Sequence, residues 1–149
     1  MKALIQRVSH ASVSVSGSEV SAIGPGLLVL LGVVRGDTGA EAARLARKIA
    51  GMRIFPDSEG VMNVNITDAG GDILAVSQFT LAASLRRGNR PSYALAAPGE
   101  EALPLYEEFC LRLEELTGRP VGRGVFGADM QVSLVNDGPV TIIADTADF

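Results

Sequence analysis

The chain has 149 residues, of which 47% are hydrophobic and 20% are charged, and its formal net charge is −4. This size and composition predict one folded domain, residues 1–149, with a substantial core, and they exclude a disordered or fibrous protein. The negative charge argues against broad electrostatic binding of nucleic acid, which needs many Lys or Arg contacts. A local contact with an RNA end would need only one basic loop.

The longest apolar run, residues 27–34, is too short to span a bilayer. The first ten residues, MKALIQRVSH, lack the apolar segment and the cleavage site of a signal peptide. Cys110 is the only cysteine, so the chain cannot form an intrachain disulfide. We therefore expect a cytoplasmic protein with no membrane segment.

The first part of the chain predicts several strands and one helix. Alternating apolar and polar residues at 2–16 predict two short strands, and residues 19–23 predict a third. The apolar run at 27–34 predicts a strand buried on both faces. Thr38 and Glu41 have the spacing of a capping box, and the apolar residues at 42, 45, 49 and 52 recur at helical spacing behind them. We therefore expect a helix that begins next to Thr38.

The rest of the chain predicts a hairpin at 53–66, a strand at 72–82, a loop at 84–98, a helix at 102–116 and a strand-rich end at 121–145. In that last segment the turn formers Asn-Asp-Gly-Pro at 136–139 separate two β-branched runs and predict a hairpin. The order of elements predicts an α/β fold bordering on α+β. We expect a three-layer sandwich in which two helices pack on one face of a mixed, mostly antiparallel β-layer, and a second β-layer covers the other face.

Familiar catalytic patterns are weak in this sequence. Residues 122–127 match G-x-G-x-x-G, but that pattern binds dinucleotides between a strand and a helix, and here it runs into a strand-like segment. His10 and Cys110 are the only histidine and cysteine, so we expect no metal site, no cofactor and no His-based triad. We interpret Cys110 as a packing residue of the second helix.

A polar cluster follows the apolar part of the strand at 72–82. Alternation along a strand would place Gln78 and Thr80 on one face, and Ser77 and Phe79 on the other. A loop rich in arginine comes next. From the residue types alone, an exposed strand end followed by a solvated loop is the simpler interpretation.

Two longer motifs carry a resemblance. SQFTLAA at 77–83 and NDGPVT at 136–141, together with RGNRPSY at 87–93 and FGADMQVSLV at 126–135, resemble the D-aminoacyl-tRNA deacylase family. The resemblance covers almost the whole chain, and the motifs occur in the family's order. Tyr93 stands where the family pattern has Phe.

The resemblance implies a cytoplasmic homodimer that hydrolyses the ester between a D-amino acid and the 3'-terminal ribose of tRNA, and that also removes glycine from mischarged tRNA. It implies that Ser77, Gln78, Phe79 and Thr80 line the site. Gly138-Pro139 would correspond to the family's Gly-cisPro motif, a chirality gate that reaches into the partner's pocket. Because only about 5–6% of X–Pro bonds in folded proteins are cis, local rules do not predict this isomer.

Two mechanisms remain open for such a site. Thr80 is the obvious nucleophile, but a neutral hydroxyl needs a base, and His10 lies far away in the sequence. We favour substrate assistance, in which the vicinal ribose hydroxyl helps to activate water and main-chain N–H groups near Phe79 and Thr80 stabilise the oxyanion.

Further residues are candidates for contacts with the CCA end of tRNA. We expect the phosphates to be bound by Arg86, Arg87 and Arg90. Phe126 and Met130 would border the terminal adenine, although strand packing explains them equally well. The competing interpretations are a non-enzymatic, RNA-end-binding β-rich dimer and an editing hydrolase for a different aminoacyl ester.

Overall fold

The long first strand, β1 (Lys2–Val15), organises the sheet in this computed structural model, which describes all 149 residues. Along one edge β1 pairs antiparallel with β8 (Met130–Asp145). Along the other edge its first half pairs with β3 (Gly26–Gly32) and its second half with β2 (Ser18–Ile23), both antiparallel. The sheet continues from β3 through two strands that run parallel to it, β6 (Asp72–Ser77) and β7 (Gly122–Arg123).

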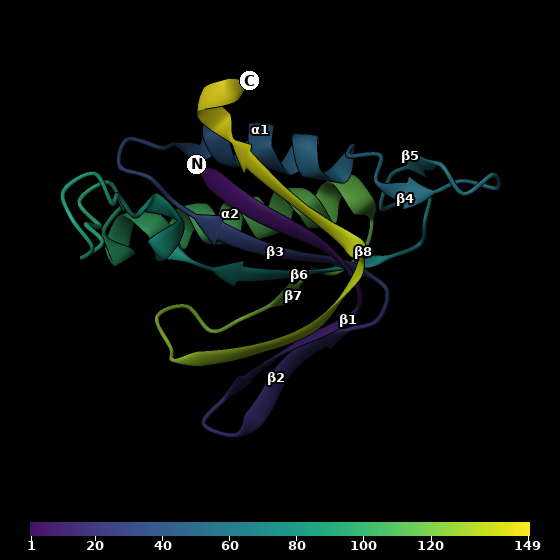
Figure 1. Cartoon of the computed structure of the whole chain (residues 1–149), viewed down its shortest axis with the longest axis horizontal. Coiled ribbons are helices and arrows are strands. Elements are labelled where there is room, and N and C mark those ends of the chain that lie inside the picture. Colours follow the sequence, from purple (N-terminus) through teal and green to yellow (C-terminus); the bar gives the residue numbers. More distant parts are fainter.

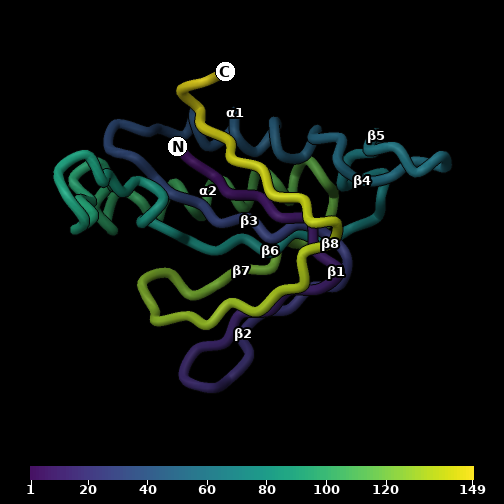
Figure 2. The backbone as a smooth tube through the Cα atoms, in the orientation of Figure 1, coloured from purple at the N-terminus to yellow at the C-terminus, as the bar shows by residue number.

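Both β1 and β8 bend and pass from one β-layer to the other (Figures 1 and 2). The expectation of two separate strands at 2–16 was therefore wrong. The register between β1 and β8 shifts on both sides of Val8: β8 carries extra residues between Asn136 and Thr141, and β1 carries one extra residue between Val8 and His10. Such bulges change which side chains face inward, so one continuous strand shows two alternation patterns.

The two helices, α1 (Gly39–Ala50) and α2 (Gly99–Thr117), cover one face of the sheet (Figure 1). A core of 24 buried residues fills the space between the helices and the sheet, and a second core of six lies between the two β-layers. β3 contributes Leu27 and Val29 to the first core and Leu28 to the second, so this strand is buried on both faces. The predicted three-layer sandwich is confirmed.

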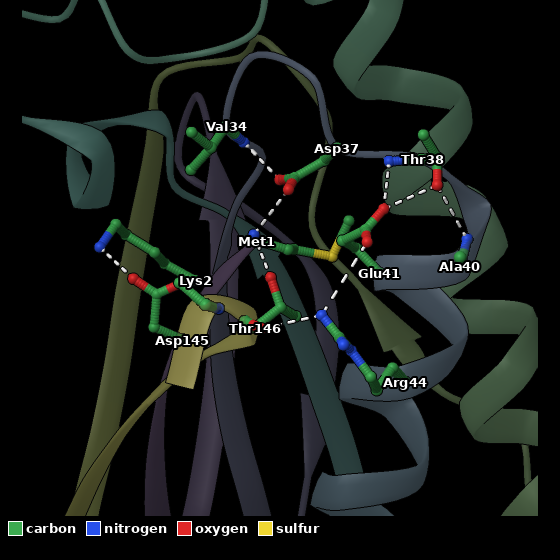
Figure 3. Close-up of polar contacts among 11 residues, drawn as sticks. Met1, Lys2, Val34, Asp37, Thr38, Ala40, Glu41, Arg44, Asp145 and Thr146 are labelled. Carbon is green, nitrogen blue, oxygen red and sulfur yellow. Dashed lines mark hydrogen bonds and ion pairs between the residues drawn. The ribbon is translucent and has the colours of Figure 1, made fainter. Parts of the chain in front are cut away.

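The capping box before α1 is confirmed. The Thr38 hydroxyl accepts a hydrogen bond from the Ala40 N–H, and a carboxylate oxygen of Glu41 accepts one from the Thr38 N–H at 2.8 Å. Nearby, the α-ammonium group of Met1 donates to the Asp37 carboxylate and to the Thr146 hydroxyl, both at 2.7 Å (Figure 3). The segment before α1 is thereby tied to β1 and to the short helix η2 (Thr146–Asp148).

The remaining elements are short. The predicted hairpin at 53–66 is present as β4 (Phe55–Pro56) paired with β5 (Met62–Val64). The strand predicted at 72–82 ends at Ser77, and a 3-10 helix, η1 (Phe79–Ala82), follows. Neither α1 nor α2 has the combination of length and apolar sequence that a membrane-crossing helix requires.

Candidate functional site

A cavity of about 490 Å³ opens where β6 ends, between the sheet and α2. Ser77, Gln78 and Phe79 line one part of it, and Phe126 and Met130 line another. Eleven of its 15 lining residues are hydrophobic. The structure therefore brings together five predicted site residues from two segments that are far apart in the sequence. Thr80 is not among the lining residues.

The turn that carries SQFTL, residues 77–81, begins as β6 leaves the sheet. The Gln78 N–H donates to the Leu31 carbonyl at 2.7 Å, and the chain then enters η1. The Gln78 side-chain amide donates to the Thr80 hydroxyl. The strand alternation expected for these two side chains was therefore wrong, since Gln78 and Thr80 lie beyond the strand. They meet because the chain turns, and the partner of the Thr80 hydroxyl is an amide that cannot act as a base.

The main chain of this turn offers hydrogen-bond donors. The N–H groups of Phe79 and Thr80 have no acceptor within the chain, whereas the next N–H, that of Leu81, donates to the Gln78 carbonyl at 3.2 Å. The first N–H groups of a helical turn have no intrahelical partner, which explains why these two are unpaired. Two adjacent donors are therefore available to an oxyanion bound at the turn.

Tyr106 of α2 also lines the cavity, although it was not among the predicted site residues. Its hydroxyl donates to the Ala75 carbonyl at 2.9 Å, and its ring lies 6.0 Å from that of Phe126. Burial, with a further contribution from the neighbouring Cys110, raises the pKa of Tyr106 far above its ordinary value. Burial likewise raises the pKa of the Cys110 thiol to about 11. Both groups are therefore neutral near pH 7, and Cys110 is a buried packing residue as expected.

The arginine loop, residues 84–92, leaves the same turn. Ser84 and Ser92 close it with two reciprocal main-chain hydrogen bonds of 2.9 Å each. Its three arginines, Arg86, Arg87 and Arg90, are exposed and form no ion pair. Directly after the loop, the ring of Tyr93 contacts that of Phe79 edge-on, with centroids 5.1 Å apart. The loop is thus held next to the cavity.

The segment around Gly138-Pro139 is a bulge, defined here as residues 136–140, and the hairpin predicted there was wrong. Both flanks pair with β1, since Asn136 lies opposite Val8 and Thr141 opposite Gln6. The Asn136 side chain closes the bulge by accepting a hydrogen bond from the Val140 N–H at 2.7 Å. The Gly138-Pro139 peptide bond is cis, and both residues are exposed.

Gly138 is required by the geometry of the bulge. Its φ of +141° is a conformation that side chains rarely adopt, and an added Cβ would come within 2.8 Å of the Val140 side chain and 3.1 Å of the Arg7 guanidinium. Arg7 also donates to the Asp137 carbonyl at 2.9 Å. These contacts fix the main chain of the bulge.

The bulge and the cavity lie apart within one chain. Arg7, beside the bulge, pairs with Leu27 at the start of β3, whereas Ser77 pairs with Leu31 near its end. Four residues along a strand correspond to about 13 Å. Neither Gly138 nor Pro139 lines the cavity. The bend of β8 accordingly lies at the end of the central strands opposite to the loop at 84–98 (Figures 1 and 2).

The structure contains no group of three or more His, Cys, Asp or Glu side chains that could hold a metal ion. The G-x-G-x-x-G match at 122–127 forms β7 and a loop that leads into β8, without the following helix that a dinucleotide site needs. Of residues 122–127, Phe126 and Gly127 line the cavity.

Solved structures with the same fold define the class of protein. A c-Myc DNA unwinding element binding protein superposes with a TM-score of 0.92 at 43% identity, covering 98% of this chain and 99% of that chain. A probable eukaryotic D-amino acid tRNA deacylase shares the fold with a TM-score of 0.83 at 17% identity, covering 96% and 97%. The chain therefore has the same mixed α/β fold as these two structures.

Sequence comparison assigns the family. The chain belongs to the D-Tyr-tRNA(Tyr) deacylase family, whose profile matches residues 4–145. A relative from Roseiflexus castenholzii is 60% identical over 149 residues, covering 100% of this chain and 94% of the relative. One from Geobacter sulfurreducens is 58% identical over 146 residues, covering 98% and 95%. Both are D-aminoacyl-tRNA deacylases, which confirms the resemblance drawn from the SQFTL and NDGPVT motifs.

Proposed function

We propose that this protein is a cytoplasmic homodimer that hydrolyses the ester of D-aminoacyl-tRNA and releases the free D-amino acid and tRNA. Membership of the deacylase family over residues 4–145 is the observation that carries this proposal. The SQFTL turn supports it, because its first three residues line the apolar cavity and the turn offers unpaired main-chain donors. The same reaction would act as a proofreading step in translation.

We propose a substrate-assisted reaction. An aminoacyl ester is already activated, so the site mainly has to position it and to stabilise the tetrahedral oxyanion. The unpaired N–H groups of Phe79 and Thr80 suit the oxyanion, and losing one such donor typically slows an enzyme by about 10²–10³-fold. The hydroxyl of Thr80 has an amide partner, and His10 is exposed on β1 opposite Val135. The vicinal ribose hydroxyl is then the group best placed to help activate water.

The cavity suits the terminal adenosine of the CCA end. Its walls are apolar, and the half-buried ring of Phe126 among them offers a flat base an aromatic contact. Met130 lines the same wall. The phosphates preceding the adenosine would then meet the exposed arginine loop, whose three arginines lack acidic partners in the chain.

We propose that Gly138-Pro139 acts as the chirality gate of the partner subunit's cavity. The distance between bulge and cavity within one chain supports delivery from a second copy. A rigid main-chain wall rejects any L-side chain by steric clash, whereas a fitted side-chain pocket discriminates by only about 1–3 kcal/mol per methylene and would restrict the accepted D-amino acids. Glycine has no side chain to clash, so the same gate would admit glycyl-tRNA.

One assay tests the proposal. Purified protein is incubated with matched D-tyrosyl-, L-tyrosyl- and glycyl-tRNA, and loss of the ester is followed. We expect rapid loss of the D-ester and the glycyl ester and retention of the L-ester. Loss of the L-ester at the same rate would refute the gate. No loss of any ester, with tRNA binding intact, would favour a non-enzymatic RNA-end-binding dimer.

A further inference from the structure

Phe79 combines a place in the cavity wall with high exposure. It lines the cavity, yet its side chain is 57% exposed, so few core contacts hold it. The one aromatic ring in contact with it is Tyr93, edge-on at a centroid distance of 5.1 Å and an interplanar angle of 70°. This geometry is favourable for an aromatic pair because the positive edge of one ring meets the negative face of the other. Tyr93 is therefore the aromatic support of the exposed Phe79 ring.

Tyr93 itself lies at the start of a firmly anchored segment. Its carbonyl accepts a hydrogen bond from the Ala96 N–H at 3.0 Å, and the carbonyls of Ala94 and Leu95 accept two from Arg35, both at 2.9 Å. Arg35 belongs to the connection between β3 and α1, where the Val34 N–H donates to Asp37, the partner of Met1 (Figure 3). Residues 93–97 are thus fixed to the body of the protein.

On its other side Tyr93 adjoins the arginine loop. Ser92, which pairs with Ser84 at the base of that loop, immediately precedes Tyr93. Ser84 in turn follows η1 by two residues. The ring contact between Phe79 and Tyr93 therefore joins the turn that carries the unpaired N–H groups to the residue that follows the arginine loop.

We infer that Tyr93 is a positioning residue for deacylation. Its ring holds Phe79 in place and thereby fixes the N–H donors of Phe79 and Thr80, while its backbone connects that turn to the arginine loop. The inference rests on the proposed oxyanion role of these donors. Its ring, and not its hydroxyl, carries the effect, because the hydroxyl has no hydrogen-bond partner within the chain.

A role confined to the loop makes a different prediction. If Tyr93 only kept the arginine loop folded, its loss would weaken tRNA binding and leave the rate of the bound complex unchanged. If it positions the turn, its loss lowers the rate of the bound complex at unchanged affinity. Tyr93 is 41% exposed, so its truncation leaves the core intact and both quantities can be measured on folded protein.

The test compares Tyr93→Ala with Tyr93→Phe, and with Leu95→Ala as a matched control from the same segment. Leu95 is 54% exposed and does not line the cavity. We measure the single-turnover rate constant with saturating D-tyrosyl-tRNA and the Kd for uncharged tRNA. Loss of an aromatic pair lowers a rate constant by about tenfold at most. We expect a fall of that order for Tyr93→Ala, wild-type rates for the other two variants and an unchanged Kd for all three.

A wild-type rate for Tyr93→Ala, or a loss that appears only in Kd, would overturn the inference. The amide NMR signals of Phe79 and Thr80 provide a readout without substrate. Their chemical shifts should change in Tyr93→Ala and remain those of the wild type in Tyr93→Phe and Leu95→Ala. An inactive wild-type protein would refute the proposed function alone, since these signals still report whether Tyr93 holds the turn.

Discussion

The buried hydroxyl of Tyr106 allows a stability change to be worked out from the structure. Tyr106→Phe removes one oxygen from a side chain that is 3% exposed and that donates to the Ala75 carbonyl at 2.9 Å. The same carbonyl also accepts the Gly124 N–H at 3.0 Å, so the substitution leaves no buried acceptor without a partner. The loss in free energy of unfolding is therefore that of one ordinary hydrogen bond, about 1 kcal/mol. A buried acceptor left without a partner would cost more, about 1–3 kcal/mol.

Thermal unfolding measures this cost. For a chain of 149 residues, an unfolding entropy of about 2.1 cal/mol/K per residue converts 1 kcal/mol into a fall in Tm of about 3 °C. Tyr93→Phe is the matched control, because its hydroxyl is exposed and unpaired, and its Tm should not change. Both variants are compared at one protein concentration, since Tm depends on concentration in an oligomer. An unchanged Tm for Tyr106→Phe, or a fall above about 10 °C, would refute the reasoning.

Three further predictions concern titration, catalysis and tRNA binding. The pKa of the Cys110 thiol is raised in the folded protein, so the unfolded chain loses this proton first, from about pH 9. The free energy of unfolding should therefore fall by about 3 kcal/mol between pH 9 and pH 11. Urea unfolding at a series of pH values measures this fall, which should be smaller for Cys110→Ala. Thr80→Ala should keep single-turnover deacylation within about tenfold of wild type, and abolished turnover with intact tRNA binding would instead identify a direct nucleophile. Replacing Arg86, Arg87 and Arg90 by serine should weaken tRNA binding and reduce its salt slope by about 0.7 for each phosphate that is no longer neutralised, whereas an unchanged slope would return them to a solvated loop.

The parts of the fold that the sequence predicted well are those set by nearby residues. The capping box of Thr38 and Glu41 and the apolar face of α1 are contained within one helix, and the run in β3 is apolar because both faces are buried. The continuous β1 was missed because the phase of its alternation is set by the register with β8, more than 100 residues away. The end of β6 at Ser77 was missed for a related reason: SQFTL alternates as a strand would, and the turn that follows Ser77 is seen only in the tertiary structure, where the Gln78 N–H donates to the Leu31 carbonyl.

In the candidate site, too, features set by nearby residues were predicted and features set by tertiary packing were not. Ser77, Gln78 and Phe79 were found as a motif, but their meeting with Phe126 and Met130 in one cavity depends on tertiary packing. Tyr106 gave no separate signal because a helix residue that faces both core and cavity has the same periodicity as a core residue. The Asn-Asp-Gly-Pro segment has the residue types of a hairpin turn. It forms a bulge because both of its flanks find the same partner strand, β1.

The separation of bulge and cavity leads to a test of which subunit supplies the gate. Gly138→Ala should displace the bulge, because its Cβ would come within 2.8 Å of Val140, and should allow loss of the L-ester. Ala128→Trp should block the cavity that Ala128 lines. When Gly138→Ala chains are co-expressed with an excess of Ala128→Trp chains, nearly every open cavity lies in a mixed dimer. If the gate acts across the dimer, that cavity receives an intact gate, so hydrolysis of the L-ester should disappear while hydrolysis of the D-ester persists. If the gate acts within its own chain, the ratio of L- to D-ester hydrolysis should remain that of Gly138→Ala alone, and the proposed arrangement would be wrong.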